Sequence, residues 1–256
     1  MLTQPGLEQS LRQLLLPTFA KRHLHVATAC EGEGRSHLDY LLQLTQEELE
    51  HRQRQKIDKL LKAAKLPRNK HLQDFESKRI PGLSLSVLQR LSQGEFIERY
   101  ENILIFGNPG TGKTHLSIAL AREWCLQGRR VYYTNAAHLV QQLLQSKQEL
   151  KLTQFIKKLD RFEVLLIDDI SYIPFERSET DVLFHLLSER YEARSTLITS
   201  NLPFGQWPAL FKDEMTTAAL IDRLVHHATI LELNAESYRM AQAKITHQGG
   251  SKMTTS

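Results

Sequence analysis

The chain has 256 residues, of which 24% are charged and 41% hydrophobic, as is typical of a globular protein with one medium-sized domain and a smaller one. The formal net charge of +4 permits an acidic partner but does not demonstrate one. No apolar run approaches the ~18 residues of a membrane span, and Glu8 and Arg12 interrupt the apolar pattern that a signal peptide requires. We therefore expect a cytoplasmic protein without membrane contact, in which Cys30 and Cys125 are free thiols.

The first part of the chain, residues 1–66, is predicted to be a small all-helical domain. Leucines recur at helical spacing before Pro17, which should end or kink the first helix. The sequence EGEGR at 31–35 indicates a turn, and Pro67 should close the last helix. A second run of leucines at helical spacing comprises Leu38, Leu41, Leu42 and Leu49.

The last helix of this domain has a basic side. Acids dominate residues 31–50, whereas lysine and arginine dominate residues 51–79. At helical spacing, an apolar stripe lies opposite four basic residues, namely Arg52, Lys56, Lys59 and Lys62. Such a side is often only solvated charge, but four bases without an acid among them favour DNA binding. Because no aromatic residue is interleaved with them, contact with a duplex backbone is favoured over stacking with a single strand.

From residue 99 onward, short apolar runs alternate with helical patterns. Strands are predicted at 103–106, 130–135, 163–168 and 195–201, with helices at 112–127, 136–146 and 179–193. This alternation predicts an α/β fold, in which helices flank a doubly wound parallel sheet over residues 99–245. Residues 67–98 should form a connector with a turn at Pro81 and Gly82 followed by a short helix, and the polar residues 246–256 a disordered tail.

The segment GNPGTGKT at 107–114 matches the phosphate-binding loop G-x-x-x-x-G-K-[ST]. A predicted strand stops before it and a predicted helix follows it, as that loop requires. Its backbone N–H groups and the helix N-terminus would hold phosphate oxygens, while Lys113 reaches the β- and γ-phosphates of ATP. The candidate nucleotide-binding residues are Gly107, Asn108, Pro109, Gly110, Thr111, Gly112, Lys113, Thr114 and His115.

Polar residues at the ends of two later strands complete a candidate catalytic site. The strand VLLIDD at 164–169 ends in two acids, of which Asp168 could join Thr114 in binding Mg²⁺. Asp169 could orient and deprotonate the attacking water. Asn201, at the tip of the next strand, could bind the γ-phosphate or that water. Each motif alone could be a plain strand end, but together with the loop they favour ATP hydrolysis.

Residues 218–239 contain two arginines of interest. Arg223 could stabilise transition-state charge from a neighbouring subunit, although most arginines only form surface ion pairs. Arg239 is the second candidate for stabilising charge on the transferring phosphoryl group. We take the adjacent His226 and His227 to lie on a helix, where neighbouring residues do not share a face, so we do not expect a two-histidine metal site.

These motifs resemble the transposition helper ATPases of bacterial insertion sequences, the IstB-like branch of AAA+ ATPases close to the helicase loaders. The resembling segments are GNPGTGKTHLSIALA, LLIDD, LITSNLPFGQW, DRLVHH, ESYR and the basic stretch HRQRQKIDKLLKAAKLPRNKHLQDF. The resemblance implies that Asp168–Asp169 form Walker B, Asn201 sensor 1, Arg223 a trans-acting arginine finger and Arg239 the sensor 2 contact. AAA+ proteins mostly carry glutamate where this chain has Asp169, so slow hydrolysis is compatible with the sequence.

The resemblance implies an ATPase that forms homo-oligomers on double-stranded DNA with ATP and Mg²⁺ and directs a partner transposase. A replicative helicase loader is the alternative within the same AAA+ branch, and the helicase would then be the partner. A small-molecule P-loop kinase would have no use for the basic helix. A DNA-binding module with a decayed nucleotide site conflicts with the intact Lys113, Thr114 and Asp168.

Overall fold

The structure is a computed structural model that describes residues 4–171, 174–211, 214–235 and 237–238. It divides into two compact units, Met1–Lys59 and Leu60–Ser256, and the division falls within one continuous helix. The predicted tail at 246–256 and Arg239 lie outside the described residues. Among the residues described, no helix is both long enough and apolar enough to cross a membrane.

The first unit is built from helices, as the sequence predicts. Helix α1 spans Gln4–Gln13, α2 spans Pro17–Gly32, and α3 spans His37–Ala64 and continues into the second unit. Pro17 begins α2, where a missing backbone N–H costs nothing. The core of this unit is small and contains Val26, Cys30 and Leu44.

The second run of leucines is helical, as predicted, but it does not enter this core. Leu38, Leu41, Leu42 and Leu49 are all more than half exposed in the described structure. Leu44, which lies on another face of α3, is buried instead. Helical spacing therefore identified the helix but not the face that packs.

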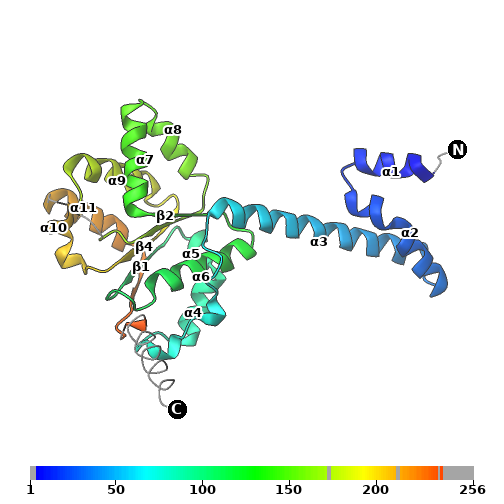
Figure 1. The fold of residues 1–256 in the computed structure, drawn as a ribbon, viewed down its shortest axis with the longest axis horizontal. Coiled ribbons are helices and arrows are strands. Elements are labelled where there is room, and N and C mark those ends of the chain that lie inside the picture. Colours follow the sequence, from blue (N-terminus) through cyan, green and yellow to red (C-terminus); the bar gives the residue numbers. More distant parts are fainter. Residues whose placement is uncertain (1–3, 172–173, 212–213, 236, 239–256) are drawn as a thin grey trace, which may run out of the picture. The chain divides into compact units, whose positions relative to one another are not determined.

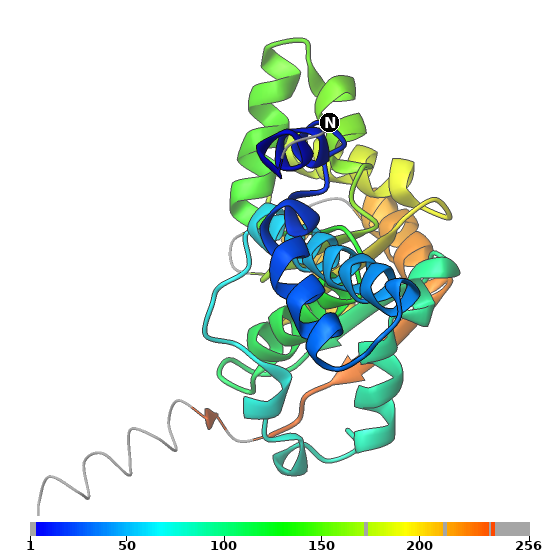
Figure 2. The ribbon, with the colours of Figure 1, turned by 90° about the vertical axis from the view of Figure 1, so that its right-hand side faces the viewer.

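The second unit contains a five-stranded parallel sheet with strand order β2-β3-β4-β1-β5. Figures 1 and 2 show this unit from two directions. The four predicted strands are confirmed within one residue at each end. The strands are β1 (Asn102–Phe106), β2 (Val131–Asn135), β3 (Val164–Asp168), β4 (Ser195–Ser200) and β5 (Ala228–Glu232).

The helices of this unit cover both faces of the sheet, as the alternating pattern predicts (Figure 1). Helices α4, α5 and α6 pack on one face, and α7 to α11 pack on the other. Their bounds are α4 Leu85–Gln93, α5 Glu95–Glu98, α6 Lys113–Leu126, α7 Ala136–Gln148, α8 Leu152–Leu159, α9 Arg177–Arg190, α10 Trp207–Phe211 and α11 Glu214–Val225.

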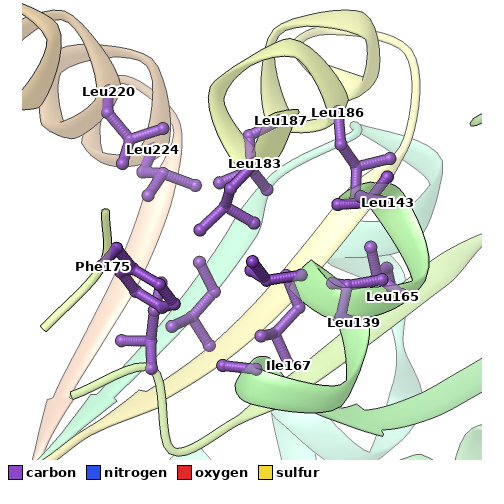
Figure 3. Packing of buried hydrophobic residues seen from close by; sticks show 14 of the residues in the cluster. Leu139, Leu143, Leu165, Ile167, Phe175, Leu183, Leu186, Leu187, Leu220 and Leu224 are labelled. Carbon is purple, nitrogen blue, oxygen red and sulfur yellow. The ribbon is translucent and has the colours of Figure 1, made fainter. Parts of the chain in front are cut away.

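Two apolar layers hold the sheet between these helices. Figure 3 shows part of one layer, in which Leu165 and Ile167 of β3 lie among leucines of α7, α9 and α11. On the opposite face, Ile103 and Ile105 of β1 pack with α4, α5, α6 and the end of α3 at Ala64. Because strand side chains alternate between faces, continuous apolar strands such as β1 and β3 supply both layers.

The sequence did not predict β5, which pairs with β1 at the edge of the sheet. Helix α11 ends at Val225, and His226 and His227 form a turn before the strand begins at Ala228. The expectation of a continuous helix through the two histidines was therefore wrong. Apolar residues on α11 and β5 follow one another without a glycine or proline, so the sequence gives no local signal for the change.

Arg190, at the end of α9, is almost completely buried. Its guanidinium donates to the carbonyl oxygens of Ser195 at 2.7 Å and of Leu159 and Phe162 at 3.3 Å. Burial lowers the pKa of Arg190 to about 10, and burial also raises the pKa of its ion-pair partner Asp160. The cost of removing both groups from water therefore exceeds the attraction between them. The hydrogen bonds to the three carbonyl oxygens, and not the ion pair, account for the contribution of Arg190 to stability.

We expect Arg190→Met to lower the free energy of unfolding by about 3 kcal/mol, because the buried carbonyl oxygens lose their charged donor. Urea unfolding of the full chain measures the change. Arg177→Met, at the exposed start of the same helix, is the control and should change stability little. Equal stability of the two variants would contradict this role.

Candidate nucleotide-binding site

The phosphate-binding loop lies where the sequence predicts it, between the end of β1 at Phe106 and the start of α6 at Lys113. Two positions in this loop have no room for a side chain and are occupied by glycine. Gly107 has φ +150°, and a Cβ at this position would lie 2.6 Å from the carbonyl oxygen of Leu233. Gly110 has φ +85°, and a Cβ there would collide with the side chain of Ser237. Glycine is therefore required for both the backbone conformation and the close approach of the segment after β5.

Lys113 is buried, and its ammonium group donates to the carbonyl oxygens of Gly107 at 2.7 Å and Asn108 at 3.0 Å. These contacts hold the positive charge inside the curve of the loop. Lys113 also lines the cavity above that loop, so the same ammonium can meet phosphate oxygens. This placement agrees with the role expected of a phosphate-loop lysine.

Asp168, at the end of β3, lies against the start of α6. Its Oδ1 accepts hydrogen bonds from the hydroxyl of Thr114 at 3.0 Å and from the hydroxyl of Thr199 at 2.7 Å. Two neighbouring oxygen ligands of an octahedral Mg²⁺ lie about 3.0 Å apart, because each is about 2.1 Å from the ion. The hydroxyl of Thr114 and the carboxylate of Asp168 therefore have the spacing and the oxygen chemistry that suit Mg²⁺.

Asp169 follows with a left-handed backbone, at φ +59°, which is unusual for a residue other than glycine. Its backbone N–H donates to the hydroxyl of Thr199 at 2.8 Å, and its carboxylate accepts from the side-chain amide of Asn201 at 3.1 Å. These bonds from β4 hold Asp169 at the cavity, which both Asp169 and Asn201 line. The structure thus brings together two residues that the sequence placed at separate strand ends.

Thr199, the residue that joins the two acids, was not predicted from the sequence. One hydroxyl donates to Asp168 and accepts from the backbone N–H of Asp169. Thr199 is almost completely buried. Its place in the segment LITSN was only a weak signal for a role at the site. Which side chain of β4 lies beside Asp168 depends on the register in which β3 and β4 pair.

We expect Thr199→Val, which keeps the shape of the side chain, to raise the Mg²⁺ concentration needed for turnover by about 10- to 100-fold, as for other residues that orient metal ligands. The measurement is ATP hydrolysis across a Mg²⁺ series. Thr196→Val, a buried threonine on the same strand, is the control. An unchanged Mg²⁺ dependence in Thr199→Val would contradict the positioning role.

Tyr133, on β2, also reaches Asp168. Its hydroxyl donates to Oδ2 at 3.4 Å. Burial, with the nearby charge of Asp168 as the second cause, raises the pKa of Tyr133 to about 12. The hydroxyl therefore keeps its proton at neutral pH and supports the second oxygen of the carboxylate.

A cavity of about 680 Å³ opens above the loop, and much of its wall comes from segments that sequence reasoning left out of the site. Tyr238, after β5, lines it and lies against the guanidinium of Arg79, which is 5.2 Å from the ring centre. Ala235, also after β5, lines the cavity as well. The expected connector supplies a further set of missed residues, namely Asn69, Lys70, Asp74, Phe75, Glu76, Arg79 and Ile80.

Two residues of α6, spaced seven apart on one face, hold the connector in place. Arg122 donates to the carbonyl oxygens of Pro67 at 2.9 Å and Arg68 at 3.2 Å. His115 lies 3.0 Å from the carbonyl oxygen of His71 through its Nε2. His115, predicted to bind nucleotide, thus contacts the connector beside the cavity that it also lines.

The two predicted arginines have different outcomes. Arg223, near the end of α11, packs its guanidinium 4.8 Å from the centre of the Phe184 ring. It is not among the described residues that line the cavity of its own chain. Arg239 lies outside the described residues.

The basic side of α3 is exposed, but its four residues are not equivalent. Arg52 donates to the buried carboxylate of Glu48 at 2.8 Å and to the carbonyl oxygen of Leu15. Its guanidinium thus links α3 to the turn between α1 and α2. In the described part of the chain, Lys56, Lys59 and Lys62 form no ion pair and remain exposed.

Comparison with protein families gives one match that spans most of the chain. The model of a family described as IstB-like ATP binding protein matches residues 9–246. A relative from Sinorhizobium fredii, named as an insertion sequence ATP-binding protein (y4iQ/y4nD/y4sD), is 40% identical over 234 residues. That match covers 91% of this chain and 78% of the relative.

Solved structures that are similar to this chain share its fold. The DnaC helicase loader superimposes with a TM-score of 0.51 and 20% identity, covering 57% of this chain and 86% of that one. AMPPCP-bound DnaA from Aquifex aeolicus has a TM-score of 0.55 and 20% identity, covering 72% of this chain and 56% of that one. These likenesses confirm the predicted fold, a parallel sheet flanked by helices.

Proposed function

The chain belongs to the family of IstB-like ATP binding proteins, and from this premise we propose that it hydrolyses ATP as a DNA-binding helper of transposition. The observation that carries the proposal is the convergence of Thr114, Asp168, Asp169 and Asn201 beside the loop that holds Lys113. Phosphoryl transfer to water needs this set of groups.

Each group has a separate part in the proposed hydrolysis. Lys113 binds the β- and γ-phosphates, and Thr114 with Asp168 would hold a Mg²⁺ ion, which neutralises phosphate charge when bound. Asp169 orients the attacking water and accepts its proton. Asn201 fixes the carboxylate of Asp169 through its amide, at 3.1 Å. Because aspartate is one methylene shorter than glutamate, we expect slow turnover, which suits an ATPase that times assembly and release.

The proposed active form is a homo-oligomer in which Arg223 of one subunit reaches the nucleotide of the next. The position of Arg223 outside the cavity of its own chain supports a trans role over a cis role. ATP would favour assembly on target DNA, and hydrolysis would favour release. The partner transposase of the same element would then act where the oligomer is bound.

For DNA, we propose that Lys56, Lys59 and Lys62 contact duplex phosphates. They are exposed on one side of a single helix, whereas Arg52 chiefly holds α3 to the turn between α1 and α2. Phosphate contacts position a protein without reading bases, so binding through this face should depend little on sequence.

Replacing the three lysines with glutamine should flatten the log–log salt dependence of duplex binding by about 2.7, because each neutralised phosphate contributes about 0.9 to the slope. ATP binding should be unchanged. Fluorescence anisotropy with labelled duplex across a salt series measures the slope.

The control for this variant replaces three exposed lysines on α7 and α8, namely Lys147, Lys157 and Lys158, with glutamine. It removes the same net charge elsewhere. Equal slopes in the two triple variants would show that α3 makes no specific contribution to DNA contact.

The identity of the protein partner can be tested by binding. Full-length protein with ATP and duplex DNA is presented with either the transposase of its element or a replicative helicase, both purified. The proposal predicts retention of the transposase. Retention of only the helicase would support the alternative function of a helicase loader.

A further inference from the structure

The turn after α11 and the segment after α9 bring together three side chains of metal-binding types, none of which is among the described residues that line the nucleotide cavity. Glu192, His226 and His227 each offer a ligand atom, and these atoms lie within 4.8 Å of one another. The imidazole rings of the two histidines are 4.0 Å apart between centres. This proximity arises because α11 ends at Val225, so that the histidines occupy a turn.

We propose that Glu192, His226 and His227 form a binding site for a transition-metal ion of the zinc class. Two imidazole nitrogens and one carboxylate form a ligand set that suits Zn²⁺, whereas Mg²⁺ and Ca²⁺ prefer oxygen ligands alone. Ligands of one tetrahedral zinc ion lie about 3.4 Å apart, since each is about 2.0–2.2 Å from the metal. Small side-chain rotations therefore complete the site, and its exposure leaves a fourth position for water.

Tyr191 forms a hydrogen bond with His226, one of the three proposed ligands. Its hydroxyl oxygen lies 2.8 Å from Nδ1 of His226. When Nδ1 carries its proton and donates it to this oxygen, Nε2 is left bare to bind the metal. A ligand histidine held by such a second hydrogen bond is a recurrent feature of metal sites.

Glu192 supplies the negative charge among the three proposed ligands. Arg223 lies on the last turn of α11, three residues before His226.

The ion would add a second link between two elements that the contact between Tyr191 and His226 already joins. Glu192 follows α9, and the histidines follow α11, so one ion would restrain the ends of both helices. The backbone N–H of Asn102 also donates to the carbonyl oxygen of His227 at 2.7 Å, which fixes the turn to the start of β1. Arg223 lies one turn before the histidines, so metal binding would also restrain the helix that carries it.

The test is a Zn²⁺ titration of untagged full-length protein, without nucleotide and with excess Mg²⁺ present. We expect one zinc ion per chain and a rise in melting temperature on zinc addition. Glu192→Gln, His226→Asn and His227→Asn should each weaken zinc binding by at least about tenfold and remove the thermal shift. Co²⁺ in place of Zn²⁺ should give the visible absorption of a tetrahedral site.

His185→Asn is the matched control, because His185 is an exposed histidine on α9 outside the cluster. It should bind zinc as the wild type does. Glu192→Gln changes a surface side chain without altering its size, so its result is informative even if a histidine variant folds poorly. Wild-type affinity in any folded variant of the three ligands, or no zinc binding by the wild type, would overturn the proposal.

Discussion

Lys113→Ala should weaken ATP binding by at least about 100-fold. Removing one partner from a buried, charge-assisted contact costs about 3–5 kcal/mol, and about 1.4 kcal/mol corresponds to a tenfold change in affinity. The lysine is buried at the base of the cavity, and its ammonium is already held within the loop by two carbonyl oxygens. Titration of the variant with a fluorescent ATP analogue measures the loss.

The control for Lys113→Ala is Lys147→Ala, on the exposed side of α7. Near-ultraviolet circular dichroism reports on the buried Trp124 and Trp207 and shows whether the fold is kept. Wild-type ATP affinity in a folded Lys113→Ala protein would contradict the assignment of the phosphate-binding loop.

Arg223→Ala should lower ATP turnover by roughly 10³-fold or more, while ATP affinity in the isolated subunit stays the same. The reason is that Arg223 lies outside the cavity of its own chain and is proposed to act only on the nucleotide of a neighbour. Turnover is measured with saturating ATP and duplex DNA. Arg161→Ala, which removes an exposed arginine elsewhere on the chain, serves as the control.

Mixing two inactive variants tests the trans role directly. Lys113→Ala contributes Arg223 but no nucleotide, and Arg223→Ala contributes a nucleotide without the arginine. Their mixture should recover part of the wild-type turnover. If the two proteins assemble together and still show none, Arg223 does not act in trans.

The parts of the site that the sequence predicted depend on short, local patterns. The loop from Gly107 to Thr114 is continuous in sequence, so its residues cannot be separated by folding. Asp169 and Asn201 were predictable because the carboxyl ends of parallel strands meet at one edge of a sheet, and the structure joins them by a hydrogen bond of 3.1 Å.

The missed parts depend on contacts between distant segments. Thr199 reaches Asp168 only because β3 and β4 pair in a particular register. The connector becomes part of the cavity wall because Arg122 donates hydrogen bonds to three of its carbonyl oxygens. No spacing pattern in the sequence predicts these contacts. The end of α11 at Val225 was missed for a similar reason, since pairing of β5 with β1 overrides the local helical pattern.

The central claim is that nucleotide hydrolysis and duplex binding are coupled in one protein. The most direct measurement is the rate of ATP hydrolysis by the full-length wild type as duplex DNA is added, with Lys113→Ala defining the background. We predict that the rate above background rises with duplex concentration until it saturates. A rate that is the same with and without duplex, in a protein shown to bind both ATP and DNA, would contradict the account.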